Sequence, residues 1–92
     1  MSDLLIRRRH ALGMTELQQR VGQIADKMTA RFGAQCVRHG DVIRIEHRDV
    51  KGTITMTLSE VVIEARLGFA LKLFKARAEQ EITRILEREL TP

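Results

Sequence analysis

Short runs of alternating apolar and polar residues fill the middle of the chain and predict β-strands. Turn-forming residues at 39–41, 49–52 and 59–60 separate the runs. Alternation with connections this short is typical of an antiparallel meander with one face in water. An earlier run, with Leu4 and Ile6 on one face, adds a first strand. The predicted strands cover residues 4–9, 34–39, 42–48, 53–58 and 61–67.

The last two of these strands show the clearest division into a core face and a wet face. Thr53, Thr55 and Thr57 share the polar face of the first of them. The side chains predicted to enter the core are Ile54, Met56, Leu58, Val61, Ile63, Ala65 and Leu67.

Two other stretches have apolar residues at the spacing of an amphipathic helix. The first begins after Thr15, which has capping-box spacing to Gln18, and ends at Gly33. The second covers about residues 70–90. The predicted core stripes are Leu17, Val21, Ile24, Ala25, Met28 and Phe32 in the first helix, and Leu71, Phe74, Ala78, Ile82, Ile85 and Leu86 in the second.

Each predicted element has a single apolar face, which must be buried against another element. The order β-α-β-β-β-β-α therefore predicts a two-layer α+β fold, an antiparallel sheet with both helices packed on one face. The 92 residues contain no linker or repeat, so we expect a single domain, 1–92. A chain of this size has little room for a deep active-site cavity.

The net charge of +4 favours anionic partners without choosing among nucleic acid, lipid and acidic protein. Cys36 is the single cysteine, so an intrachain disulfide is excluded and a reducing compartment fits. The N-terminal apolar run is too short for a signal core or a spanning helix. These features predict a cytoplasmic protein without a transmembrane segment.

Metal binding and catalysis find little support in the sequence. Cys36 and His39 have a Cys-x-x-His spacing, but residues three apart on a strand point to opposite faces. A nucleophile would need a neighbouring base and an orienting third group, and no spacing supplies them. Threonines on a wet strand face are what strand propensity predicts. We therefore expect no catalytic residue, no metal and no cofactor.

The segment 66–77, RLGFALKLFKAR, combines four cations, no acidic residue and two of the three phenylalanines. On a helical projection, Phe69 and Leu73 point away from the core stripe, unless the helix begins later and Phe69 folds under the turn. Lys72 and Lys75 lie at the end of the helix where the dipole disfavours cations. Cations around exposed apolar side chains are typical of an interfacial surface. The candidate partner-binding residues are Arg66, Phe69, Lys72, Leu73 and Lys75.

The reversed charge order of this helix has two interpretations. Lys75 could pair with Glu79, and Arg77 with Glu81, at i,i+4 spacing. Alternatively, free backbone N–H groups at the helix start and the nearby cations could attract an anion.

Arg7, Arg8 and Arg9 form a second candidate anion-binding segment. With the cations of 66–77 they could neutralise phosphates as one basic patch. Nucleic acid is nevertheless disfavoured, because the sequence has no Trp or Tyr for base stacking and the meander separates the two helices. A small basic nucleic-acid-binding regulator stays an alternative.

Four motifs, in their order and spacing, carry a family resemblance. They are Ile6-Arg7-Arg8-Arg9-His10-Ala11-Leu12, Arg31-Phe32-Gly33, Val50-Lys51-Gly52-Thr53, and Leu67-Gly68-Phe69 with Phe74-Lys75. Over nearly the full chain, the sequence resembles the small polyhydroxyalkanoic acid system proteins of Gram-negative bacteria, also called granule-region proteins. One departure is Ala76, where the resemblance implies glycine.

The resemblance implies a role beside the genes for making, storing and using polyhydroxyalkanoate, with some members linked to the granule surface. It carries over no catalytic residue. Together with segment 66–77, it predicts a small non-enzymatic accessory protein, at storage granules in the cytoplasm, that binds the granule surface or a granule protein.

A carrier of an acyl chain or its coenzyme A thioester is a further alternative. It requires an apolar pocket beside Phe69, with the phosphates at the start of the second helix. Either segment 66–77 or an unpaired sheet edge could also form a homodimer.

Overall fold

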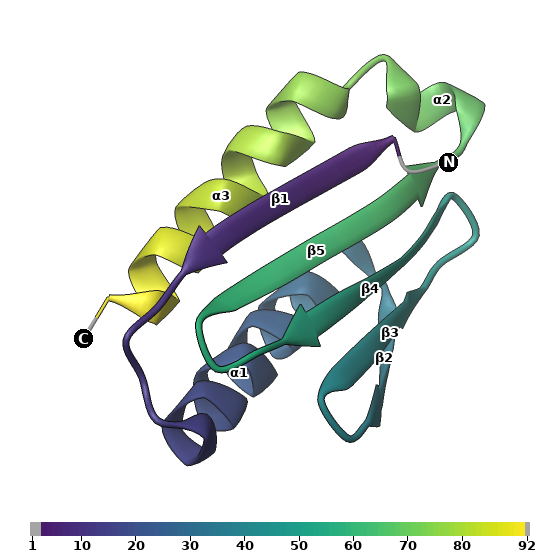
Figure 1. Ribbon diagram of the computed structural model, residues 1–92. Helices are drawn as coiled ribbons and strands as arrows, with labels where there is room; N and C mark the ends of the chain where they lie inside the picture. Colours follow the sequence, from purple (N-terminus) through teal and green to yellow (C-terminus); the bar gives the residue numbers. More distant parts are fainter. Residues whose placement is uncertain (1–2, 92) are drawn as a thin grey trace.

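The computed structural model describes residues 3–91 as one antiparallel sheet covered by helices (Figure 1). It is the predicted α+β fold in the predicted order, with the second helix divided in two. The elements are β1 Leu4–Arg9, α1 Met14–Phe32, β2 Gln35–His39, β3 Val42–Glu46, β4 Val50–Met56, β5 Glu60–Leu67, α2 Phe69–Lys72 and α3 Lys75–Leu90.

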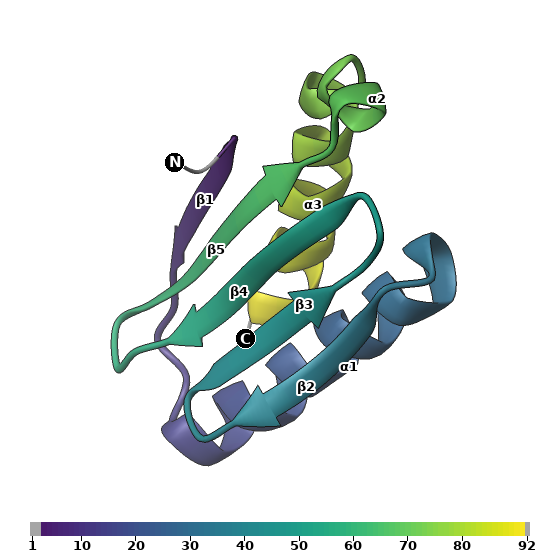
Figure 2. The same cartoon turned by 90° about the vertical axis from the view of Figure 1, so that its right-hand side faces the viewer.

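The strand order across the sheet is β1-β5-β4-β3-β2, and all neighbours are antiparallel. Strands β2 to β5 form the predicted meander. Strand β1 pairs with β5 at the edge opposite β2, with Leu4 opposite Ala65 and Arg9 opposite Glu60. Helix α3 packs against β1 and α1 against β2. Both helices therefore cover the same face of the sheet, as Figure 2 shows, and the other face is open.

The core lies between this sheet face and the two helices. Of the side chains predicted from strand alternation, all but Leu58 are buried. Leu58 is 82 % exposed because the strand ends before it. The Thr57 N–H donates to the Glu60 carbonyl at 2.9 Å, and the Glu60 N–H donates to Thr57 Oγ1 at 3.0 Å. These bonds close a tight turn with Leu58 at its tip, outside the ladder.

Helix α1 starts one residue before the predicted cap. Gly13, and not Thr15, is the N-cap residue, and its carbonyl accepts the Leu17 N–H at 2.8 Å. The predicted end at Gly33 is confirmed, with φ of 69° in the left-handed region that glycine tolerates best. Phe32, at the last helical position, is partly exposed and not a full core residue.

The second predicted helix is interrupted at Leu73 and Phe74. The Phe74 N–H donates to the Leu71 carbonyl at 2.9 Å, which is a tight turn and not a continued α-helix. After the interruption, Ile82, Ile85 and Leu86 are buried as predicted. Before it the prediction is wrong, because Leu71 is only half-buried and Phe74 is exposed.

Polar contacts join the two long helices. Glu81 pairs with Arg31 of α1, whereas the sequence had suggested Arg77, and Lys27 pairs with Glu89. The Arg20 guanidinium donates to the carbonyl of Glu89 at 2.8 Å, near the C-terminal end of α3. Such exposed ion pairs each contribute little to stability.

Candidate functional site

Three large apolar side chains are exposed together at α2 and the turn that follows it. Phe69 is 87 %, Leu73 80 % and Phe74 57 % exposed, and we call this group the apolar corner. Helix α2 and the turn after it, which carry the corner, lie beyond the end of the sheet (Figure 2). The prediction that Phe69 and Leu73 face away from the core is confirmed, and the alternative in which Phe69 folds under the turn is wrong. Phe74 is also exposed, although the sequence predicted that it would be buried in the core.

Gly68 sets the direction in which the chain leaves the sheet. Its N–H donates to the Asp49 carbonyl at 2.7 Å, and a Cβ built on it would lie 3.4 Å from that oxygen. The Gly68 carbonyl accepts the N–H groups of Leu71 at 3.0 Å and Lys72 at 3.1 Å. These are the ordinary first bonds of a helical turn, and α2 ends after four residues, so the single long helix on which the predicted anion site depended is absent from residues 3–91.

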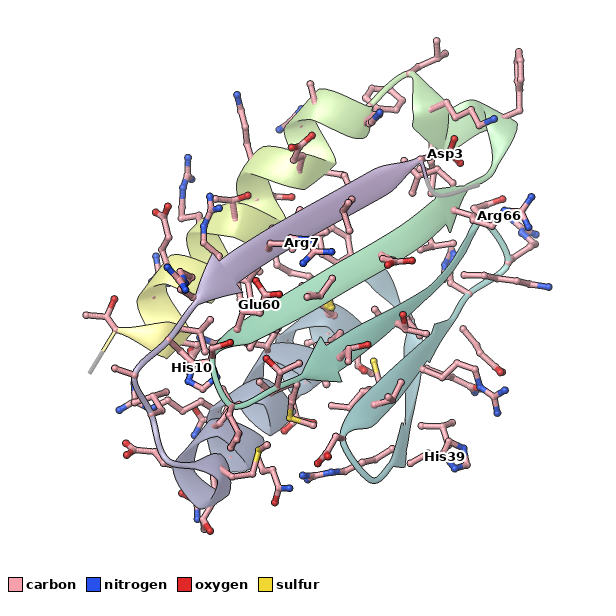
Figure 3. The ribbon with its side chains drawn as sticks, viewed as in Figure 1. Asp3, Arg7, His10, His39, Glu60 and Arg66 are labelled. Atoms are coloured by element: carbon pink, nitrogen blue, oxygen red, sulfur yellow. The ribbon has the colours of Figure 1, made fainter. Side chains whose placement is uncertain are left out.

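The predicted cations beside the corner are partly neutralised by Asp3, which the sequence did not reveal. The Leu67 N–H donates to Asp3 Oδ2 at 2.9 Å, and Lys72 Nζ lies 3.8 Å from Oδ1. Figure 3 shows Asp3 and Arg66 at this end of β1 and β5. The hydrogen bond from Leu67, helped by the charges of Lys72, Lys75 and Arg66 and opposed by desolvation, holds the pKa of Asp3 below its ordinary value.

Replacement of Asp3 by asparagine tests this charge cluster. Since the pKa of Asp3 is lower folded than unfolded, its carboxylate stabilises the fold above the unfolded pKa of 3.8, and this stabilisation is lost as pH falls through the folded pKa. We expect Asp3→Asn to be less stable than wild type in urea at pH 7, and the difference to vanish in strong acid. An Asp3 pKa at or above 3.8 in an NMR titration would contradict this account.

The three arginines of β1 do not lie on one face of the sheet. Arg7 lies on the open sheet face and pairs with Glu60 at 2.9 Å, on the neighbouring strand in Figure 3. Arg8 points to the helix side, 3.7 Å from Glu87. Arg9 is opposite Glu60 of β5. Glu60 precedes Arg66 by six residues on the same strand, so Arg9 and Arg66 are about 20 Å apart along the sheet. This placement does not favour the single basic patch that the sequence suggested.

No cluster suited to a metal ion occurs within residues 3–91. Cys36 is opposite Ile45 on the core face, and its Sγ lies 3.8 Å from the Ala25 carbonyl oxygen. His39 is opposite Val42 on the other face, so the predicted separation of Cys36 and His39 is confirmed. Within the same residues, every helix is too short or too polar to cross a lipid bilayer.

A cavity of about 300 Å³ lies under the interruption between α2 and α3, and we call it the joint cavity. Its sheet side is shallow because Ala34 and Ala65 are small. Leu71, Phe74 and Ala78, the first residues of the predicted core stripe, line the opposite side. The stripe therefore faces the sheet as predicted, but it meets a hollow there, which explains why these three residues are not fully buried.

A known protein family covers almost the whole chain. The family model "Putative polyhydroxyalkanoic acid system protein" matches residues 4–90 of the 92. The chain belongs to this family. No curated protein and no solved structure matches it significantly. Membership links the protein to the polyhydroxyalkanoate system, but the family description names no reaction and no catalytic residue.

Several motif residues of this polyhydroxyalkanoate-system protein have structural roles. His10 Nδ1 accepts the Leu12 N–H at 3.1 Å, so a neutral ring carries its proton on Nε2 and donates it to the Thr57 carbonyl at 2.8 Å. Gly33 ends α1, and Gly68 starts α2. The side chain of Phe69, by contrast, is exposed and makes no such contact with residues 3–91.

Proposed function

We propose that this protein is a non-enzymatic accessory protein of polyhydroxyalkanoate metabolism that binds the storage-granule surface in the cytoplasm. The apolar corner is the binding surface, and Arg66, Lys72 and Lys75 flank it. The observation that carries the proposal is the exposure of Phe69, Leu73 and Phe74 together on one projecting corner. Isolated exposed apolar residues are ordinary, whereas a group of them indicates an interaction surface.

A polyester granule matches this surface in both of its properties. Its apolar polymer can take up Phe69 and Leu73, and anionic groups of its polar coat can face the cations. Burial of the two side chains would contribute roughly 3–6 kcal/mol before association costs. That corresponds to weak attachment for one copy, so many copies on one granule, a dimer or a granule protein would be needed for firm binding.

Co-sedimentation with purified granules tests the proposal, with wild type compared against Phe69→Ser combined with Leu73→Ser. We expect the granule-bound fraction to fall at least about tenfold, because the variant loses most of the apolar contact. Both side chains are exposed, so the variant should fold normally, which circular dichroism will show.

The matched control is Leu5→Ser combined with Leu58→Ser. Leu5 and Leu58 are also exposed leucines, but Leu5 lies on the open sheet face and Leu58 at the β4–β5 turn, at the other end of β5 from α2. We expect this control to bind like wild type. Equal binding by the corner variant would refute the proposal. Salt-sensitive binding to DNA or RNA without granule binding would favour the nucleic-acid regulator instead.

A further inference from the structure

We propose that the joint cavity binds the chain of a free acyl carboxylate and that Arg77 binds the carboxylate group. The cavity borders the granule-binding surface at Phe74, which belongs to both, whereas Phe69 and Leu73 do not line the cavity. The proposal depends on three observations: the cavity is apolar, its rim has a spare cation, and the thioester alternative has lost its phosphate site.

The walls of the cavity are suited to a hydrocarbon chain. Met28 and Phe32 come from α1, Ile45 and Ala65 from the sheet, and Leu71 from α2. Its volume of about 300 Å³ is at the lower end of ligand pockets. Since a dry apolar cavity of about 150 Å³ holds benzene, this one has room for roughly ten to twelve non-hydrogen atoms. A chain of about ten carbons would complete the core that Leu71, Phe74 and Ala78 leave open.

The rim of the cavity favours an anionic head group. Arg77 lines the rim and has no ion pair or hydrogen bond with any residue between 3 and 91. The two rim carboxylates already have cations beside them, since Glu81 pairs with Arg31 and Asp49 lies 3.9 Å from Arg48. Three arginines against two carboxylates leave one net positive charge. An arginine guanidinium matches a carboxylate with two parallel hydrogen bonds.

His47, also on the rim, adds a donor to this arrangement. Its Nδ1 accepts the Asp49 N–H at 3.0 Å, so a neutral ring carries its proton on Nε2. This tautomer offers a hydrogen-bond donor, which an anionic oxygen can accept.

The structure favours a free acid over its coenzyme A thioester. A thioester would bring phosphates, which the sequence analysis had assigned to the start of the second helix. In the structure that helix is divided, so its start is the four-residue α2, a single turn with little dipole to hold phosphates, and the nearby Lys72 faces Asp3. We therefore assign Arg77 to a single carboxylate and no site to the phosphates.

Isothermal titration calorimetry with decanoate, decanol and acetate tests the site, at concentrations below those at which the ligands form micelles. We expect decanoate to bind, decanol to bind more weakly because it lacks the charge, and acetate not to bind because it lacks the chain. Arg77→Gln should weaken decanoate binding about tenfold or more and leave decanol unchanged. Arg84→Gln, on an exposed part of α3, is the matched control and should bind decanoate like wild type.

Filling the cavity gives a second test. Ala78→Leu places a larger side chain in the hollow on a half-exposed helix position, so we expect decanoate binding to be lost while the protein stays folded. Ala78→Met gives the same test with a more adaptable side chain. Failure of wild type to bind decanoate, or undiminished binding by both filled variants, would overturn the proposal. The variant Phe69→Ser with Leu73→Ser should still bind decanoate, so the two proposals can fail separately.

Discussion

Replacement of Gly52 by alanine is expected to lower the free energy of unfolding by about 3 kcal/mol, the upper end of the usual cost of overpacking. A Cβ at this position would overlap the Glu64 carbonyl oxygen and lie 3.0 Å from both Cα and Cβ of Ala65. Most of these atoms belong to the backbone of β5, the direct partner of β4, and cannot rotate away. The strands would have to separate in the middle of the sheet. Urea unfolding followed by circular dichroism measures the loss.

Gly22→Ala is the matched control for this substitution. A Cβ built on Gly22 meets nothing within 4 Å, and the residue lies inside α1. Alanine is a better helix former than glycine, so we expect a gain of about 1 kcal/mol. The same chemical change should thus have opposite effects at the two sites. If Gly52→Ala had the same urea midpoint of unfolding as wild type, β4 and β5 would not be as close as the structure places them.

Local alternation was sufficient to predict the five strands and their antiparallel meander, but not every bound, because β4 begins at Val50, inside the predicted turn 49–52. Ile54 and Ile63 were assigned to the core from their periodicity, and the structure places them opposite each other on the buried face. The position of β1 beside β5 depends on a pairing across more than fifty residues, and no local pattern encodes it. Leu58 shows the limit of periodicity within one run, because a turn ended the strand before the alternation ended.

The interruption between α2 and α3 could not be predicted from the helix itself. Helical periodicity shows which side chains share a face, but it does not show what lies opposite that face. Here two small side chains lie opposite that face and leave a hollow, Ala65 of β5 and Ala34 of the connection between α1 and β2, which are distant in the sequence. Phe74 was therefore predicted to be buried in the core, but it borders the cavity and is exposed.

The candidate granule-binding surface was predictable where it depends on local geometry and unpredictable where it depends on distant residues. Helical angle was enough to place Phe69 and Leu73 outside, because their direction depends only on neighbouring residues. The partner of Lys72 was not predictable, since Asp3 reaches it through the pairing of β1 with β5. Arg77 and the joint cavity were also missed, because the cavity exists only where α1, the sheet and the joint meet.

Phe74 and Leu86, near opposite ends of the core stripe predicted for the second helix, are expected to differ greatly in their contribution to stability. Leu86 is fully buried, so Leu86→Ala should lower the free energy of unfolding by about 2–5 kcal/mol. Phe74 is 57 % exposed and borders the cavity, so Phe74→Ala should cost less than about 1 kcal/mol, although the side chain removed is larger. A buried phenylalanine would cost about 3–5 kcal/mol. Urea unfolding of both variants therefore tests whether the cavity is open in solution: equal losses would mean that Phe74 closes it, which would leave no space for an acyl chain.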